Sequence, residues 1–188
     1  AGFLGLERGA RHGLGAGHRL AGRGGVGLEG RRGGGDGVGP RVDFFLFLGD
    51  TMYGDNLCPS PPNEPGADFR ATTLAEYRAR HRYQRGAEAM RRVLETTPVY
   101  AIWDDHEVRN DFAGPFDSQM PAARQALREY WPIRVAPDDP HRLYRTVRAG
   151  ADLELFILDT RQYRSRNADQ DGPAKTMLGK RQLQWLLS

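Results

Sequence analysis

Three short apolar segments of this chain each run directly into carboxylic acids, and this pattern most constrains the fold. The segments are residues 42–48 before Gly49-Asp50, residues 99–103 before Asp104-Asp105, and residues 153–158 before Asp159. Near-continuous apolar runs closed by such residues are typical of buried strands that end in loops. In open α/β sheets, ligands bind beside the carboxyl ends of the strands. The pattern therefore predicts an α/β layered fold with acids at the ends of its strands.

Helices and a hairpin are predicted around these strands. The helical spacing of apolar residues predicts helices over residues 72–95, 121–131 and 178–187. The first of these would be capped by Thr72 or Thr73 and is followed by Pro98. Residues 143–158 read as two strands joined at Gly150. The segment 54–71, rich in Pro, Gly, Asn and Asp, is expected to be a surface loop.

Residues 1–40 are expected to lie outside the folded domain. They hold 16 of the 24 glycines and no Ile, Tyr or Trp, so they cannot bury enough apolar surface to offset the entropy of ordering. Three interpretations stay open: a disordered leader, a Gly/Arg-rich nucleic-acid arm, and translation from the wrong frame of a GC-rich gene. The 25 arginines against two lysines favour the third. The expected division is a low-complexity segment, 1–40, and a domain, 41–188.

The distribution of charge argues against a nucleic-acid partner. The net charge of +3 falls on residues 1–40, and residues 41–188 hold equal numbers of basic and acidic groups. A balanced domain has no net field to attract a polyanion. No run of about 18 apolar residues indicates a membrane span, and no signal peptide is recognised at the start of the chain. The single cysteine, Cys58, excludes an intramolecular disulfide, and localisation and oligomeric state stay open.

The segment 103–107, Trp-Asp-Asp-His-Glu, is the strongest candidate for chemistry. Four consecutive ionisable residues after a buried strand are costly to place together unless a cation compensates them. His106 beside Asp105 gives a titratable group next to a carboxylate, which suits proton transfer. Asp50 and Tyr53 would place a carboxylate and a phenolate on one loop, and such oxygen donors suit a di- or trivalent metal. The plain alternatives are acids that cap helices and a surface histidine.

Five segments carry a resemblance to a known family, in order and spacing, over residues 42–188. They are LGDTMY at 48–53, LAEYRAR at 74–80, WDDHEVRND at 103–111, LDTRQYR at 158–164 and MLG at 177–179. Together they resemble the PhoD-type alkaline phosphatases of the calcineurin-like metallophosphoesterase superfamily. The WDDHE and DTRQYR strings are specific to that pattern, whereas Gly-Asp alone would be weak.

The resemblance implies a four-layer αββα sandwich, a site that holds calcium and ferric iron, and hydrolysis of small phosphate mono- and diesters. Members of the family are often exported. By the same resemblance, Asp50 would bridge two metals and Tyr53 would bind iron. Asp105 takes a place where many members of the superfamily carry a metal-binding Asn, and Asn110 is a weaker ligand candidate.

The resemblance also assigns roles toward the substrate. His106 would protonate the leaving oxygen. Arg161 and Arg164 would bind the phosphate, because a guanidinium presents planar donors to phosphate oxygens. The alternative for both arginines is a structural salt bridge to Asp159.

Two departures from the family pattern shape the expectation. The strand that carries the first metal ligand, often a Cys, should precede Val42, and residues 1–40 contain nothing like it. The histidine ligands of the family's later half also have no counterpart here. We therefore expect a partial sandwich from the N-terminal portion of such a domain, and a hydrolase that is weakly active or inactive as a fragment. The alternative is a non-catalytic remnant that keeps this face of the fold as a binding module.

Overall fold

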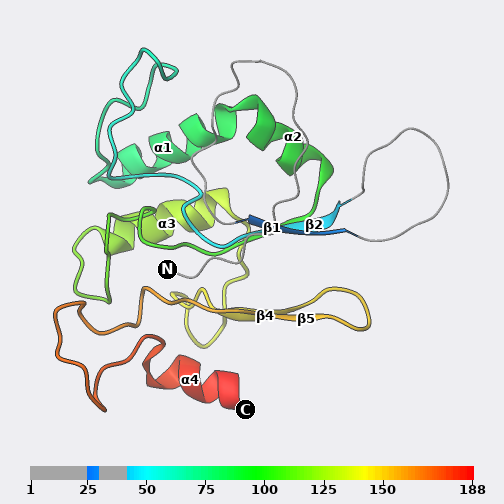
Figure 1. Cartoon of the computed structure of the whole chain (residues 1–188), viewed down its shortest axis with the longest axis vertical. Coiled ribbons are helices and arrows are strands. Elements are labelled where there is room, and N and C mark those ends of the chain that lie inside the picture. Colours follow the sequence, from blue (N-terminus) through cyan, green and yellow to red (C-terminus); the bar gives the residue numbers. More distant parts are fainter. Residues whose placement is uncertain (1–24, 30–41) are drawn as a thin grey trace, which may run out of the picture.

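The computed structural model describes residues 25–29 and 42–188 of the chain, and its architecture is mixed α/β, as predicted. In chain order the elements are β1 (Gly25–Glu29), β2 (Val42–Phe47), α1 (Leu74–Gly86), α2 (Glu88–Thr96), β3 (Val99–Ala101), α3 (Met120–Tyr130), β4 (Arg145–Arg148), β5 (Glu154–Ile157) and α4 (Gly179–Leu187). Figure 1 shows α1 and α2 on one side of the sheet that contains β2, the β4–β5 hairpin on the other side, and α4 beyond the hairpin.

The parallel pairing of β2 with β3 brings two of the acidic loops together. Phe45 lies opposite Val99 and Phe47 lies opposite Ala101, and the chain crosses between the two strands through α1 and α2. Parallel strands end at the same edge of a sheet, so the loops after β2 and β3 leave side by side. This part of the sequence prediction is confirmed.

The third acidic loop does not leave this sheet. β5 pairs antiparallel with β4 in a separate two-stranded sheet, in which Arg145 lies opposite Ile157. Sequence-local hairpin pairing therefore takes β5, and Asp159 does not follow a strand of the β2–β3 sheet. The expectation of a fully buried third strand is also wrong, because only Ile157 of β5 is buried and Phe156 is 49% exposed.

The expectation of no strand within residues 1–40 is wrong at Gly25–Glu29. This segment forms β1, which pairs antiparallel with β2 in a register that sets Val26 opposite Leu46. A strand edge presents unpaired N–H and C=O groups, and a neighbouring backbone satisfies them whatever its side chains are. The remaining parts of the 1–40 prediction, a disordered or wrongly translated segment, lie outside the described residues.

The helix predicted over residues 72–95 is two helices. α1 begins at a capping box, in which the Thr73 side chain accepts from the Glu76 N–H and the Glu76 carboxylate accepts from the Thr73 N–H. The helix ends at Gly86, and Ala87 is extended (φ −61°, ψ 130°) before α2 starts. Glycine weakens a helix by about 1 kcal/mol relative to alanine, which favours an end at this point.

Large side chains from the helices and the β3 loop form the core. Tyr77 and His81 of α1 and Met90 of α2 are buried. Trp103 meets Phe112 edge to face, with ring centroids 5.3 Å apart. Among the described residues no helix has the length and apolar character needed to cross a membrane.

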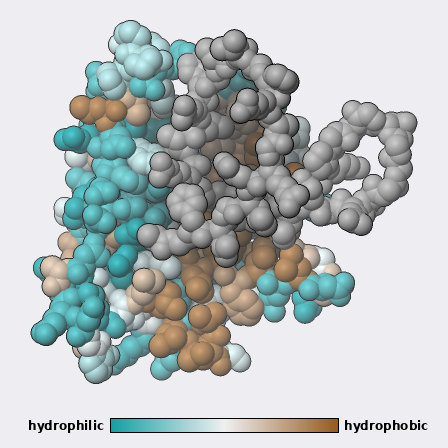
Figure 2. All heavy atoms as spheres, in the orientation of Figure 1, coloured by the Kyte–Doolittle hydropathy of each residue, from teal (hydrophilic) through white to brown (hydrophobic). Residues whose placement is uncertain are grey.

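On the face of the molecule drawn in Figure 2, apolar residues are not evenly spread. Figure 2 shows apolar residues gathered over α4 and the β4–β5 hairpin. The exposed apolar side chains of these elements and of the turn before β5 are Leu153, Phe156, Leu183 and Leu187.

Candidate metal centre

Gly49 and Asp50 give the loop after β2 the shape that brings it against the loop after β3. Both residues have positive φ, 110° for Gly49 and 53° for Asp50. A Cβ on Gly49 would lie 2.4 Å from Asp104 Cβ and 2.5 Å from Asp104 N. Real Cβ atoms do not come so close, so glycine is required for this approach of the two loops.

This close approach of the two loops places two carboxylates and one imidazole in one cluster. Asp50, Asp105 and His106 each offer one ligand atom, and these atoms all lie within 4.8 Å of one another. Asp105 is buried, and Asp50 and His106 are half-buried. The structure thus brings together three of the residues that the sequence singled out for metal binding and proton transfer.

Tyr53 joins the cluster from the same loop as Asp50. Its hydroxyl donates to Asp50 Oδ2 at 3.0 Å, and its ring stacks on the ring of His106 with centroids 4.3 Å apart. The buried Arg80 of α1 holds this loop, because its guanidinium donates to the carbonyl oxygens of Tyr53 and Ala67. The LAEYRAR segment, part of the sequence resemblance, therefore contributes a residue that holds the Tyr53 loop in place.

One oxygen of Asp50 is left without a hydrogen-bond donor. Among residues 42–188, Oδ1 of Asp50 is buried and accepts no hydrogen bond. Burial raises the pKa of Asp50, and the bond from Tyr53 and the charge of His106 only partly offset this effect. A buried carboxylate oxygen without a donor is costly unless a cation compensates it. The residues present therefore fit a bound metal ion.

Asp55 holds the ring of His106. Nδ1 of His106 lies 2.8 Å from Asp55 Oδ1, and Asp55 Oδ2 accepts from the Asn110 backbone N–H at 2.6 Å. Burial by itself lowers the pKa of His106, but the hydrogen bond and charge of Asp55, with the charges of Asp105 and Asp50, outweigh burial and raise it. Sequence reasoning missed Asp55, which lies within the segment predicted as a surface loop and gives no spacing signal.

Asn110 and Asp111, which follow the turn after β3, lie at the rim of the cluster. Asn110 is exposed, and its side-chain amide donates to Asp111 Oδ2 at 3.0 Å. Asp111, at a positive φ of 57°, donates its backbone N–H to Asp105 Oδ2 at 2.6 Å. The Asp105 carboxylate is therefore oriented by its own turn.

Arg161 reaches the cluster but pairs with acids there. Its Nε donates to Asp104 Oδ1 at 2.5 Å, and its Nη2 lies 3.3 Å from Asp105 Oδ1. Burial alone would lower the pKa of Arg161, yet the bond to Asp104 and the surrounding carboxylates raise it. Arg164 is half-buried, and its side chain makes no hydrogen bond or ion pair with another described residue.

Asp159 takes a structural place instead of joining the cluster. It is fully buried, and its Oδ1 accepts from Trp103 Nε1 at 2.9 Å and from the Gln162 N–H at 2.9 Å. Its backbone N–H and C=O both bond to the Gln182 side chain of α4. Asp159 therefore joins β5, the Trp103 loop and α4. The side chain of Arg161 pairs with Asp104 and Asp105 rather than with Asp159.

Glu107 is the second site residue whose place the sequence did not reveal. It is fully buried and accepts hydrogen bonds from Thr51 and from the Asp104 backbone. Burial raises the pKa of Glu107 to about 7, although these hydrogen bonds oppose the shift. Its position in the WDDHE string marks it as part of the site, but no local pattern shows which atoms it contacts.

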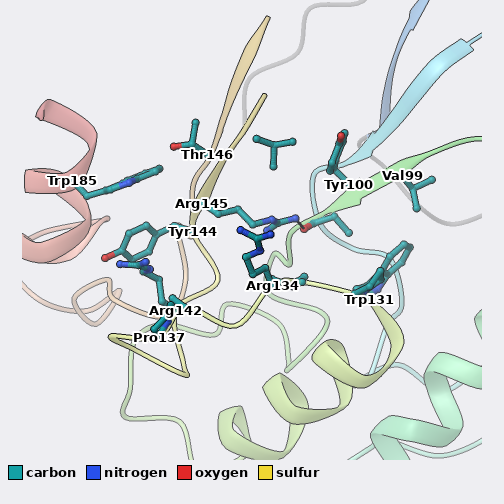
Figure 3. A pocket seen from close by; sticks show the side chains of 15 residues that line it. Val99, Tyr100, Trp131, Arg134, Pro137, Arg142, Tyr144, Arg145, Thr146 and Trp185 are labelled. Atoms are coloured by element: carbon teal, nitrogen blue, oxygen red, sulfur yellow. Dashed lines mark hydrogen bonds between the residues drawn. The ribbon is translucent and has the colours of Figure 1, made fainter. Parts of the chain in front are cut away.

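A cavity of about 580 Å³ lies away from the cluster. Figure 3 shows its lining, which comes from β3, the segment after α3, β4 and α4. Arg145 reaches across it and donates to the Ala101 carbonyl at 2.8 Å, so that one acceptor on the edge of β3 is already used. None of the residues predicted for the site lines this cavity, and the chemistry therefore places the site at the Asp50 cluster.

Comparisons with known proteins show which family this chain resembles. The family model described as PhoD-like phosphatase matches residues 36–188. Alkaline phosphatase D of Bacillus subtilis (strain 168) is 33% identical in an alignment 175 positions long, which covers 79% of this chain and 30% of that protein. A solved structure of PhoD superimposes with a TM-score of 0.59 at 32% identity, covering 75% of this chain and 32% of the other.

The chain spans about a third of the length of these relatives. The matched region includes the loops after β2 and β3 that carry Asp50, Tyr53, Asp105 and His106. With a family model that matches most of its length, the chain belongs to the PhoD-like phosphatase family.

Proposed function

We propose that the chain forms part of a metal-dependent phosphate mono- and diesterase of the alkaline phosphatase D type. The observation that carries this proposal is the cluster of Asp50, Asp105 and His106 at the carboxyl ends of two parallel strands. Family membership supports phosphoester hydrolysis as the reaction class. The arrangement of layers in Figure 1 is compatible with part of a four-layer αββα sandwich, and we propose that the complete domain has this fold.

The metal ligands in this proposal are Asp50, Tyr53 and Asp105, with Asn110 as a further donor at the rim. Asp50 would be the carboxylate shared by the two metal ions, and its unbonded buried oxygen supports a role as a ligand. Carboxylate and phenolate oxygens suit Ca²⁺ and Fe³⁺, the pair that the family resemblance suggests. Such ions, when bound, lower the pKa of a water molecule and stabilise negative charge on phosphate oxygens.

His106 is proposed to give a proton to the leaving oxygen of the ester. Its Nδ1 faces Asp55, which leaves Nε2 as the nitrogen for the substrate. The raised pKa of His106 favours the protonated ring that a general acid needs. Stacking on Tyr53 limits rotation of the ring and keeps Nε2 in one direction.

The phosphate oxygens are proposed to bind Arg164 and Arg161. Arg164 makes no side-chain bond among the described residues that would have to break first. Arg161 would reach a phosphate by exchanging its bond to Asp104 for one to the substrate. Because Arg161 also lies beside Asp105, it limits repulsion between the acids of the cluster.

The experiment is hydrolysis of p-nitrophenyl phosphate and bis(p-nitrophenyl) phosphate by the 188-residue chain at alkaline pH. We expect turnover well below about 1 per second, since two metal ions need more ligands than the described cluster offers. The residual turnover should require added Ca²⁺ and Fe³⁺ and vanish with a chelator. Turnover that a chelator does not change would reject the metal-dependent reaction, and turnover of 1 per second or more would reject an incomplete site.

A non-catalytic binding module is the second candidate function. It is favoured by the same observation, that three ligand-type side chains gather in the part of the chain that the structure describes. In that case the chain binds a metal ion without hydrolysing either ester. Metal binding measured alongside turnover separates the two functions.

A further inference from the structure

We propose that Glu107 is a positioning residue whose carboxylate ties the loop of Asp50 to the loop of Asp105 and so fixes the spacing of the metal ligands. This inference rests on the proposed metal site. It concerns a residue that does not itself belong to the cluster, because the grouped ligand atoms come from Asp50, Asp105 and His106.

The hydrogen bonds of Glu107 reach both ligand loops. Its Oε1 accepts from the backbone N–H of Thr51 at 2.5 Å and from the Thr51 hydroxyl at 2.8 Å. Its Oε2 accepts from the backbone N–H of Asp104 at 2.9 Å. Thr51 follows Asp50 directly, and Asp104 directly precedes Asp105. One carboxylate therefore holds the chain one residue away from each of the two acidic ligands.

The burial of Glu107 shows that it acts through these neighbours. Its side chain is fully buried, and its two oxygens already accept three hydrogen bonds. An apolar residue of similar size would leave those three donors without acceptors, and a buried donor without an acceptor is destabilising. The carboxylate is thus required by the two loops, whose hydrogen-bond donors it satisfies.

The backbone of the Asp50 loop needs such a tie. Gly49 and Asp50 both have positive φ, and the left-handed region is unfavourable for a residue other than glycine. Surrounding contacts must therefore hold Asp50 in this conformation. A metal site tolerates displacement of its ligands by only about 0.5 Å, so a loss of this tie should weaken metal binding before it unfolds the chain.

The experiment compares Mn²⁺ binding by the unchanged 188-residue chain and by Glu107→Gln, using calorimetric titration at a temperature where circular dichroism shows both folded. Gln has one acceptor oxygen and turns an N–H toward the Asp104 N–H. We expect the Mn²⁺ affinity to fall by about 10- to 100-fold, the usual effect of removing a hydrogen-bonding residue that orients metal ligands. Amide exchange without metal should speed up at Thr51 and Asp104.

Asp117→Asn is the matched control. Asp117 is also a buried carboxylate that accepts from a backbone N–H, that of Gln119 at 2.9 Å, and it lies outside the cluster. This variant should melt at a lower temperature yet bind Mn²⁺ within about threefold of the unchanged chain, as expected for a partner outside the ligand loops. An equal loss of affinity in both variants would overturn the positioning role.

A pair at Thr51 keeps the test valid if Glu107→Gln does not fold. Thr51→Ser retains the hydroxyl donor to Glu107, whereas Thr51→Val removes it at nearly constant volume. Binding should stay near the original value in the Ser variant and weaken in the Val variant. Equal Mn²⁺ affinities in this pair, or an unchanged affinity in Glu107→Gln, would reject the positioning role of Glu107 but not the metal site. An unchanged chain that binds no Mn²⁺ would reject the metal site itself.

Discussion

A Cβ placed on Gly49 would lie 2.4 Å from the Cβ of Asp104, so the loops after β2 and β3 meet where one residue has no side chain. This contact brings the residue before Asp50 against the residue before Asp105. The closeness of the proposed metal ligands therefore depends on a glycine that binds no metal. Its positive φ of 110° adds a second reason for glycine at this position.

Gly49→Ala should destabilise the chain strongly. The methyl group meets backbone as well as side-chain atoms of Asp104, and alanine is strained at this φ. Overpacking and strain together should cost about 2–4 kcal/mol, which lowers the melting temperature by roughly 4–16 °C in a domain of this size. Gly86→Ala is the control, because no atom lies within 4 Å of its added Cβ, and its melting temperature should stay equal or rise. Equal losses in the two variants would contradict the close contact.

Asp50→Asn and His106→Asn should separate metal binding from proton transfer. Asp50 supplies a buried oxygen that lacks a donor and lies in the ligand cluster, so its neutral amide should abolish tight metal binding. His106→Asn should keep the metal and lower turnover by roughly 10²–10⁴-fold, the usual contribution of general acid catalysis. Metal content and turnover of both variants in a catalytically active full-length protein are the measurements. Loss of metal in His106→Asn with retention in Asp50→Asn would reverse the two roles.

The sequence predicted those parts of the fold that depend on local patterns. Apolar runs gave the positions of β2 and β3, and the Asp50 and Asp105 loops meet because parallel strands end at one edge. The end of α1 at Gly86 was missed because a single glycine does not always end a helix. The pairing partner of β5 was also missed, since apolar content does not decide which strand lies alongside.

Long-range hydrogen bonds explain why the rest of the site could not be read from sequence. Asp55 contacts His106 across 51 residues, and Glu107 contacts Thr51 across 56. No periodicity links such positions, and a buried acid gives the same local pattern as a metal ligand. Asp159 illustrates this point, because it follows an apolar strand as Asp50 does but bonds to Trp103 instead of joining the cluster.

The β1–β2 pairing predicts a selective change in amide exchange when the chain begins at Arg41. The Phe45 N–H donates to Pro98 O on the β3 side, so by alternation the Leu46 N–H points toward β1, where Val26 lies opposite. Without residues 1–40, the Leu46 amide should lose protection while the Phe45 amide keeps it. Exchange measured by NMR on both chains checks this. Equal protection of Leu46 in the two chains would contradict the pairing of β1.

His81 should make the chain less stable in mild acid. The residue is buried on α1 and stacks on Tyr130 with ring centroids 5.0 Å apart, and its Nε2 is buried without a hydrogen-bond partner among the described residues. Burial lowers the pKa of His81 to about 3, and the charge of Arg85 adds to this effect while that of Glu129 opposes it. The pKa of Glu129, lowered chiefly by its bond to Arg78, is about 2, so Glu129 stays ionised over most of the relevant range.

The sign of the pH effect follows from the depressed pKa. Between pH 6.5 and about 3 the unfolded chain binds a proton on His81 and the folded chain does not, so stability falls as the pH falls. From pH 7 to pH 5 this loss should be about 2 kcal/mol. His81→Phe keeps a ring against Tyr130 but cannot titrate, and it carries every other ionisable group unchanged. Urea unfolding at pH 7 and pH 5 should therefore show that His81→Phe loses about 2 kcal/mol less stability than the unchanged chain. Equal losses in the two chains would show that His81 can be protonated in the folded state.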